Sequence, residues 1–206
     1  MQQNPDDTDW MAILENCKKP RGYIDITPKI VAIFSLKDCE EQLRRASAEK
    51  LRLAQALKSA YLAIQAALIA ALSGPMDIGA HAEKLRKKKL EYYQNGIGER
   101  PADDRVLPFE GLLKRAMDAP LALTLSDVEQ KLLTRLCCLR NNIEHPKQTS
   151  SSIEIAYILE VLPVAARTAV KLLGAVAHQL EPGVLDELNG LATQIEMHCH
   201  TMQAPL

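Results

Sequence analysis

The sequence predicts an all-α protein, an up-and-down helical bundle of about five main helices with a long first helix. Alanine and leucine are abundant and only 4% of residues are aromatic, which favours packed helices because strands prefer β-branched and aromatic residues. Apolar residues recur at helical spacing in stretches separated by proline and glycine. The 206 residues are 47% hydrophobic, enough for one core. We expect an N-terminal arm over residues 1–34, the bundle over 35–198 and a tail over 199–206.

The net charge and the cysteine content indicate which ligands and which cellular compartment to expect. The net charge is −1, so any affinity for nucleic acid must come from a local basic patch. The five cysteines are odd in number and contain no C-x-x-C pair, which indicates a reducing compartment. No secretory signal opens the chain, and the most apolar run, Tyr61 to Leu72, is too short to span a bilayer. We therefore expect a soluble, cytoplasmic protein without a membrane partner.

The first third predicts an arm followed by one long helix. Asp9 is placed to cap a short helix from Trp10 to about Cys17, and an extended segment follows. From Ser35 to Ser73 no proline or glycine intervenes, and apolar residues follow a heptad pattern that only Lys50 interrupts. The apolar stripe widens in the second half, so we expect that half to be packed and the first half to project or pair with another chain.

The middle of the chain predicts three further helices. One runs from about Met76 to Gln94, and a short one from about Glu110 to Met117. The next begins at Thr124 or Ser126, each followed three residues later by an acid. Its expected buried stripe consists of Val128, Leu132, Leu136, Leu139 and Ile143.

Two apolar helices complete the prediction. A helix from the Ser151–Glu154 capping pattern to about Leu180 is apolar almost all round, so it should be the central element, with a kink at Pro163. A last helix follows, and its apolar face carries Val184, Leu188, Leu191 and Ile195.

The most chemically capable turn of the chain is Arg140-Asn141-Asn142-Ile143-Glu144-His145-Pro146. A residue before proline is pushed out of the α region, so we expect the ring of His145 to be set by a turn. Asn141 lies one turn earlier, and Glu144 is four residues from Arg140 and so placed to pair with it. Histidine can act as acid or base near neutral pH, and arginine can bind a phosphate through two parallel hydrogen bonds. These groups suit RNA cleavage without a metal.

This turn, with the Leu-Cys-Cys-Leu before it, resembles the R-x4-6-H motif of HEPN domains, which are helical bundles and often metal-independent ribonucleases. The resemblance implies Arg140, Asn141 and His145 as catalytic residues, and the four-residue spacing to Arg140 adds Glu144 as a supporting one. It also implies a homodimer with both motifs in one cleft, RNA as substrate, no cofactor, and products with a 2′,3′-cyclic phosphate. A role as a toxin or in defence, with an antitoxin or other regulatory protein as partner, follows from the family. Lys147 stands where adenylylation-regulated members carry tyrosine.

Alternatives stand beside this hypothesis. The basic run could follow an RNA backbone or could simply be a solvated helix face. It consists of Lys84, Arg86, Lys87, Lys88 and Lys89. His198-Cys199-His200 lacks the spacing of a structural zinc site, so we expect a frayed tail there and no metal. The whole chain could also be a non-catalytic helical module that binds RNA, a partner or a second copy.

Overall fold

The fold is all-α, as the sequence predicts. The computed structural model describes residues 26–74, 78–96, 101, 104–145 and 152–203. Within these ranges it contains seven α-helices, one short 3₁₀ turn and a single isolated β-bridge. The expected short helix from Trp10 to Cys17 lies outside the described residues.

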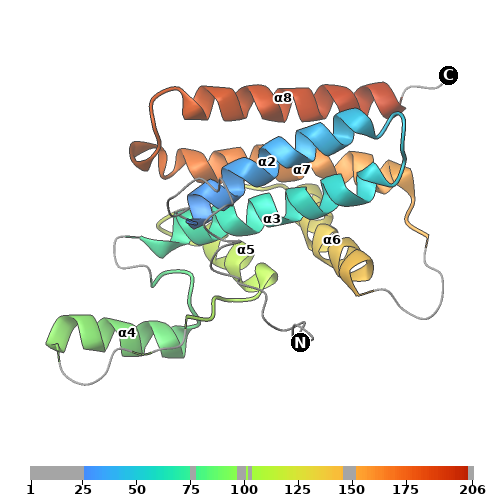
Figure 1. Cartoon of the computed structure of the whole chain (residues 1–206). Helices are drawn as coiled ribbons and strands as arrows, with labels where there is room; N and C mark the ends of the chain where they lie inside the picture. Colours follow the sequence, from blue (N-terminus) through green and yellow to red (C-terminus); the bar gives the residue numbers. More distant parts are fainter. Residues whose placement is uncertain (1–25, 75–77, 97–100, 102–103, 146–151, 204–206) are drawn as a thin grey trace, which may run out of the picture.

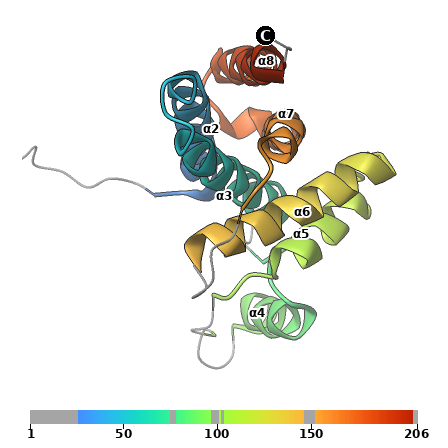
Figure 2. The same ribbon diagram turned by 90° about the vertical axis from the view of Figure 1, so that its right-hand side faces the viewer.

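Four helices form the core of the bundle. They are α2 (Pro28–Arg45), α3 (Arg52–Ser73), α7 (Ile155–Gly174) and α8 (Val184–Gln203). Each packs against two of the others, in the cyclic order α2, α3, α7, α8 (Figures 1 and 2). Most residues of α7 are buried, including Pro163, so the prediction that this helix is central is confirmed.

The prediction of one helix from Ser35 to Ser73 is wrong, because the segment folds into an antiparallel hairpin of α2 and α3. The first helix begins earlier, since the Thr27 hydroxyl accepts the Ile30 N–H and Pro28 occupies the first turn. The residues between Arg45 and Arg52 then form a turn, at the point where Lys50 interrupts the heptads. Helix α3 therefore packs against α2, which is the half of the expected long helix that we predicted to project or to pair with another chain.

Contacts across this hairpin fix its register. Ser59 on α3 donates a hydrogen bond to Asp38 on α2, and Arg52 donates to Gln42 over 3.2 Å. The expected boundary between residues 34 and 35 falls inside α2, so residues 26–34 belong to the bundle or lead directly into it.

The bundle is also not simply up-and-down. The pairs α2/α3 and α7/α8 are antiparallel hairpins, but α3 and α7 run in the same direction (Figure 1). The chain returns between them through α4 (Glu83–Asn95), α5 (Phe109–Met117) and α6 (Asp127–Glu144). Helices α5 and α6 lie across one side of the core against α3, whereas α4 stands away from the bundle.

Local signals explain most helix ends. The capping box of Ser126 and Glu129 is present at the start of α6, which confirms one of the two expected starts. Helix α4 begins at Glu83, later than the expected Met76, because the backbone N–H groups of Ile78 and Gly79 bond to the Ser73 carbonyl instead. His81 then forms a β-bridge with Val106.

Three other expectations need correction. Val128 is 66% exposed, and Leu133 occupies the buried face of α6 in its place. Helix α7 starts at Ile155 and ends at Gly174, short of Leu180, and Ser151 lies outside the described residues. The expected tail is helical through Gln203, because Cys199 is buried on the inner face of α8.

One described helix, α3, is long and apolar enough to cross a membrane by length and composition, although the run from Tyr61 to Leu72 alone is short. Half of its most apolar window is buried inside the bundle. The core helices of soluble proteins share this property.

Replacing Ser126 with alanine should remove the cap of α6 and lower the free energy of unfolding by about 1 kcal/mol. Chemical denaturation measures the change. Thr124→Ala is the matched control, since Thr124 lies before the helix and its hydroxyl donates to the Ala122 carbonyl, at 3.5 Å. Equal destabilisation by both changes would contradict the assignment of the cap.

Two buried thiols should make stability fall at high pH. Burial raises the pKa of Cys39 strongly and that of Cys199 to about 12, whereas thiols in an unfolded chain ionise near pH 8.5. Stability from each thiol is therefore complete below about pH 8.5 and is lost as pH rises towards the folded pKa. Each should lower the unfolding free energy by about 1.4 kcal/mol per pH unit in that window.

Urea titrations between pH 8 and 10.5 measure this slope. Cys39→Ala should reduce the slope by one thiol's contribution, and Cys138→Ala, at an exposed position, should leave it unchanged. An unchanged slope in the Cys39→Ala variant would show that ionisation of this buried thiol does not cause the loss of stability.

Candidate functional site

The C-terminal end of α6 presents the predicted catalytic turn. The helix ends at Glu144, and His145 follows with φ −120° and ψ 72°, outside the α region. The His145 N–H donates to the Asn141 carbonyl over 3.0 Å. The expectation that His145 leaves the helix is therefore confirmed, and its side chain is exposed.

Arg140 interacts with three other side chains, those of Asn141, Glu144 and Tyr61. Its Nη1 donates to Asn141 Oδ1 over 3.0 Å, and its Nη2 forms an ion pair with Glu144 at 2.5 Å. Its Cζ lies 5.0 Å from the ring centroid of Tyr61, which is within the range of a cation–π contact. The Nε atom is buried without a hydrogen-bond partner among the described residues. Arg140 is thus fixed in position, with 28% of its side chain exposed.

Tyr61 belongs to the site, although the sequence indicated only a core role for it. It projects from α3, is 6% exposed, and its ring centroid lies 5.2 Å from that of Phe109 on α5. Burial raises the pKa of its hydroxyl to about 12, so the ring stays neutral and can face a cation at neutral pH. The only sequence signal was a single aromatic residue within an alanine-rich helix.

A hollow of about 750 Å³ runs along the outer face of α6 and ends beside this turn. It extends from Asp127 to Asn142 and includes the cations Lys131 and Arg135. The Arg135 guanidinium lies 3.3 Å from the ring centroid of Tyr157 on α7. An extended ligand lying in this hollow would reach the turn that carries Arg140.

The structure thus brings Asn141 and Glu144 into direct contact with Arg140, and His145 directly follows Glu144 in the chain. The basic run lies elsewhere, on α4. Lys84, Lys87 and Lys88 are exposed there.

The other two members of the basic run have partners. Arg86 pairs with Glu83 over 3.0 Å, and this hydrogen bond raises its pKa. Lys89 is only 3% exposed, so it does not belong to the surface that we expected to contact RNA.

Lys89 instead joins α4 to the rest of the fold through His81. The His81 Nδ1 lies 3.0 Å from the Arg105 carbonyl, and a carbonyl only accepts, so Nδ1 carries the proton. Nε2 then accepts from the Lys89 ammonium at 3.1 Å, and Lys89 also bonds to Asp104. His81, which also forms the β-bridge with Val106, therefore has a structural role.

Among the described residues no group of three or more histidine, cysteine, aspartate or glutamate side chains could hold a metal ion. In the His198-Cys199-His200 segment, His198 lies 3.3 Å from Glu40 and His200 lies 4.0 Å from Glu196. Cys199 points into the core between them.

Comparison with known proteins gives no relative: no family model matches the chain, and neither the curated proteins nor the solved structures give a significant match.

Proposed function

We propose that this chain is a metal-independent endoribonuclease of the HEPN type, acting in the cytoplasm as a homodimer. The observation that carries the proposal is the turn at the end of α6. There an exposed histidine, His145, lies outside the helix, five residues after an arginine, Arg140, that Tyr61 and Glu144 hold in place. A toxin or defence role, with an antitoxin or regulatory partner, is the biological setting that the motif implies.

The chemistry follows from the groups in this turn. One His145 takes the proton from a ribose 2′-OH, whose oxygen attacks the adjacent phosphorus. A second His145, from the other copy, protonates the departing 5′-oxygen, so a 2′,3′-cyclic phosphate and a 5′-OH remain. Arg140 stabilises the charge that builds on the non-bridging oxygens. One chain supplies only half of the acid–base pair, and therefore the proposal requires the dimer.

Phosphate binding has to compete with the partners that Arg140 already has. Both of its Nη atoms are engaged, with Asn141 and with Glu144. A partly exposed ion pair of this kind contributes only about 1 kcal/mol, so an incoming phosphate can displace the carboxylate at small cost. We therefore assign Glu144 the role of holding Arg140 until substrate arrives, and Asn141 that of a donor to the phosphate once it is released.

A second candidate function is a non-catalytic binding module. Phe34 on α2 and Leu62 on α3 are 67% and 46% exposed, on two helices that pack together. Large exposed apolar side chains mark partner surfaces when they cluster. A long projecting helix is not the binding surface of such a module, because α2 and α3 form a hairpin.

A cleavage assay in EDTA separates the two functions. Wild type should cut single-stranded RNA, His145→Ala should lower kcat by about 10²-fold or more, and Arg140→Ala by about 10²- to 10³-fold. Glu144→Gln should change kcat/KM by less than about tenfold, because it removes only a partly exposed ion pair.

Two controls match these changes. His178→Ala removes another exposed histidine, and Arg45→Ala removes another arginine that pairs with a glutamate four residues away on its own helix, as Arg140 does. Activity that EDTA abolishes, or that survives both His145→Ala and Arg140→Ala, would refute the enzyme and leave the binding module.

Tyr61 should act as a positioning residue for Arg140. Tyr61→Phe keeps a ring under the guanidinium and should retain kcat within about threefold, whereas Tyr61→Leu removes the cation–π contact, worth about 1 kcal/mol, and should lower kcat about five- to tenfold at unchanged KM. Thermal unfolding of both variants controls for the loss of core packing against Phe109. Equal kcat for the Phe and Leu variants would exclude this role.

A further inference from the structure

The turn that joins α2 to α3 (Figure 1) lacks the signals that normally end a helix. Residues 46–51 contain no glycine or proline. Ala46, which follows α2, and Leu51, which precedes α3, both have αR backbone angles, and no side chain caps the start of α3. Helices commonly end at a residue with positive φ and begin at a side-chain cap. Neither helix end at this turn is therefore fixed by the residues of the turn itself.

Backbone hydrogen bonds of helical type continue through the turn. The Glu49 N–H donates to the Arg45 carbonyl, four residues earlier, over 3.3 Å, and the Arg52 N–H donates to the Glu49 carbonyl over 2.9 Å. Among the described residues only Ala122 is a non-glycine residue with positive φ, so every residue of the turn has a negative φ, as in a helix. A straight helix through residues 46–51 requires only that a few of them change their backbone angles.

The contacts that hold α2 can also be made between two copies of the chain. The inner face of α2 is buried, with Leu36, Cys39 and Leu43 at most 1% exposed, and it packs against α3, α7 and α8. Its Lys37 forms an ion pair with Glu187 on α8 at 2.8 Å. An α2 helix that leaves its own bundle finds the same apolar and charged surface on a second copy.

We propose that two copies of this chain exchange α2. In each copy the turn straightens, so that α2 and α3 form one helix of about 70 Å, and α2 packs on α3, α7 and α8 of the other copy. The exchange keeps the contacts of α2 outside the turn and replaces the turn by helix, while association costs translational and rotational freedom. The two straightened helices lie antiparallel at residues 46–51, around the two-fold axis.

This dimer is distinct from the one that the proposed RNA cleavage requires. Tyr61, whose ring lies near Arg140, is ten residues after Leu51, or about 15 Å along α3. The exchange therefore places the two proposed catalytic turns on opposite sides of the straightened region, about 30 Å or more apart. The inference does not rest on the ribonuclease hypothesis, so α2 exchange and RNA cleavage can each fail without the other.

Cross-linking of mixed isotopes tests the exchange directly. Equal amounts of unlabelled and ¹⁵N-labelled protein are unfolded together in urea, refolded at high concentration and separated by size-exclusion chromatography. A carbodiimide then joins the Lys37 ammonium to the Glu187 carboxylate, and mass spectrometry reads the isotopes of the linked peptides. In the dimer about half of the linked peptides should combine both isotopes, because half of randomly formed dimers contain one chain of each kind. In the monomer none should, and Glu187→Gln should abolish the link.

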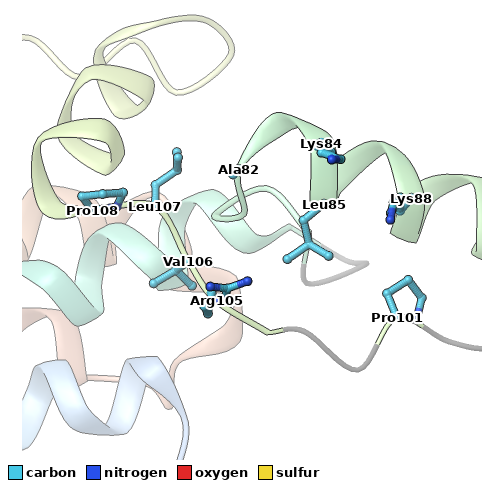
Figure 3. A pocket seen from close by; sticks show the side chains of 9 residues that line it. All are labelled: Ala82, Lys84, Leu85, Lys88, Pro101, Arg105, Val106, Leu107 and Pro108. Carbon is cyan, nitrogen blue, oxygen red and sulfur yellow. The ribbon is translucent and has the colours of Figure 1, made fainter.

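Two substitutions in the turn should shift the equilibrium in opposite directions. Lys50→Leu completes the apolar heptads and should raise the dimerisation constant about tenfold, whereas Ala48→Gly disfavours a continuous helix and should lower it about fivefold or more. Two controls should change it less than about twofold. Lys88→Leu replaces another exposed lysine, on α4 beside the hollow that Figure 3 shows, and Ala54→Gly lies within α3 in both forms. Analytical ultracentrifugation after refolding measures the constant.

Either of two results would overturn the proposal. One is a dimer in which every linked Lys37–Glu187 peptide carries a single isotope, because its chains would then associate without exchange. The other is a protein that stays monomeric after refolding both as wild type and as Lys50→Leu, with circular dichroism confirming that both are folded.

Discussion

The packing of α3 is the constraint on which the rest of the structure depends. This helix contacts α2, α7, α5 and α6, and its buried face is rich in alanine, including Ala56, Ala60, Ala63 and Ala67. Small side chains let neighbouring helices approach closely. A larger residue at these positions would strain the close packing of α3 against its neighbours. The same packing holds α5 and α6 across the core, and through α6 it sets the position of the turn that we propose to be catalytic.

Tyr61 connects this core to the chemistry. It is a large polar residue on the buried face of α3, it packs on Phe109, and its ring lies under Arg140. Arginine side chains lose considerable rotamer entropy when fixed, and here packing, an ion pair and a hydrogen bond share that cost before any substrate binds. His145 differs from Arg140, because it lies beyond the last helical turn and is exposed. A fixed cation and an accessible imidazole at the same helix end are the two groups that the proposed cleavage of RNA uses.

The features that depend on residues close together in the sequence were predicted correctly. Periodicity and composition predicted an all-α fold and a central α7, Ser126 with Glu129 predicted the start of α6, and Pro146 predicted that His145 leaves the helix. The predictions failed where contacts between residues far apart in the sequence determine the structure. The interruption of the heptads at Lys50 does not by itself distinguish a hairpin from a continuous helix, because the hairpin is stabilised by the burial of α2 against α3. The burial of Lys89 likewise depends on His81 and Asp104, and the value of Tyr61 depends on Arg140, which is distant in the sequence.

The central claim is that His145 activates a ribose 2′-OH. The most direct measurement uses a DNA oligonucleotide that contains a single ribonucleotide, incubated in EDTA, with the product ends identified by mass spectrometry. The account predicts one cut, on the 3′ side of that ribonucleotide, a 2′,3′-cyclic phosphate on the upstream fragment, and no cut when the residue is 2′-deoxy or when His145 is alanine. Cleavage of the all-DNA strand, a cut elsewhere in the chain, or an intact substrate would contradict it.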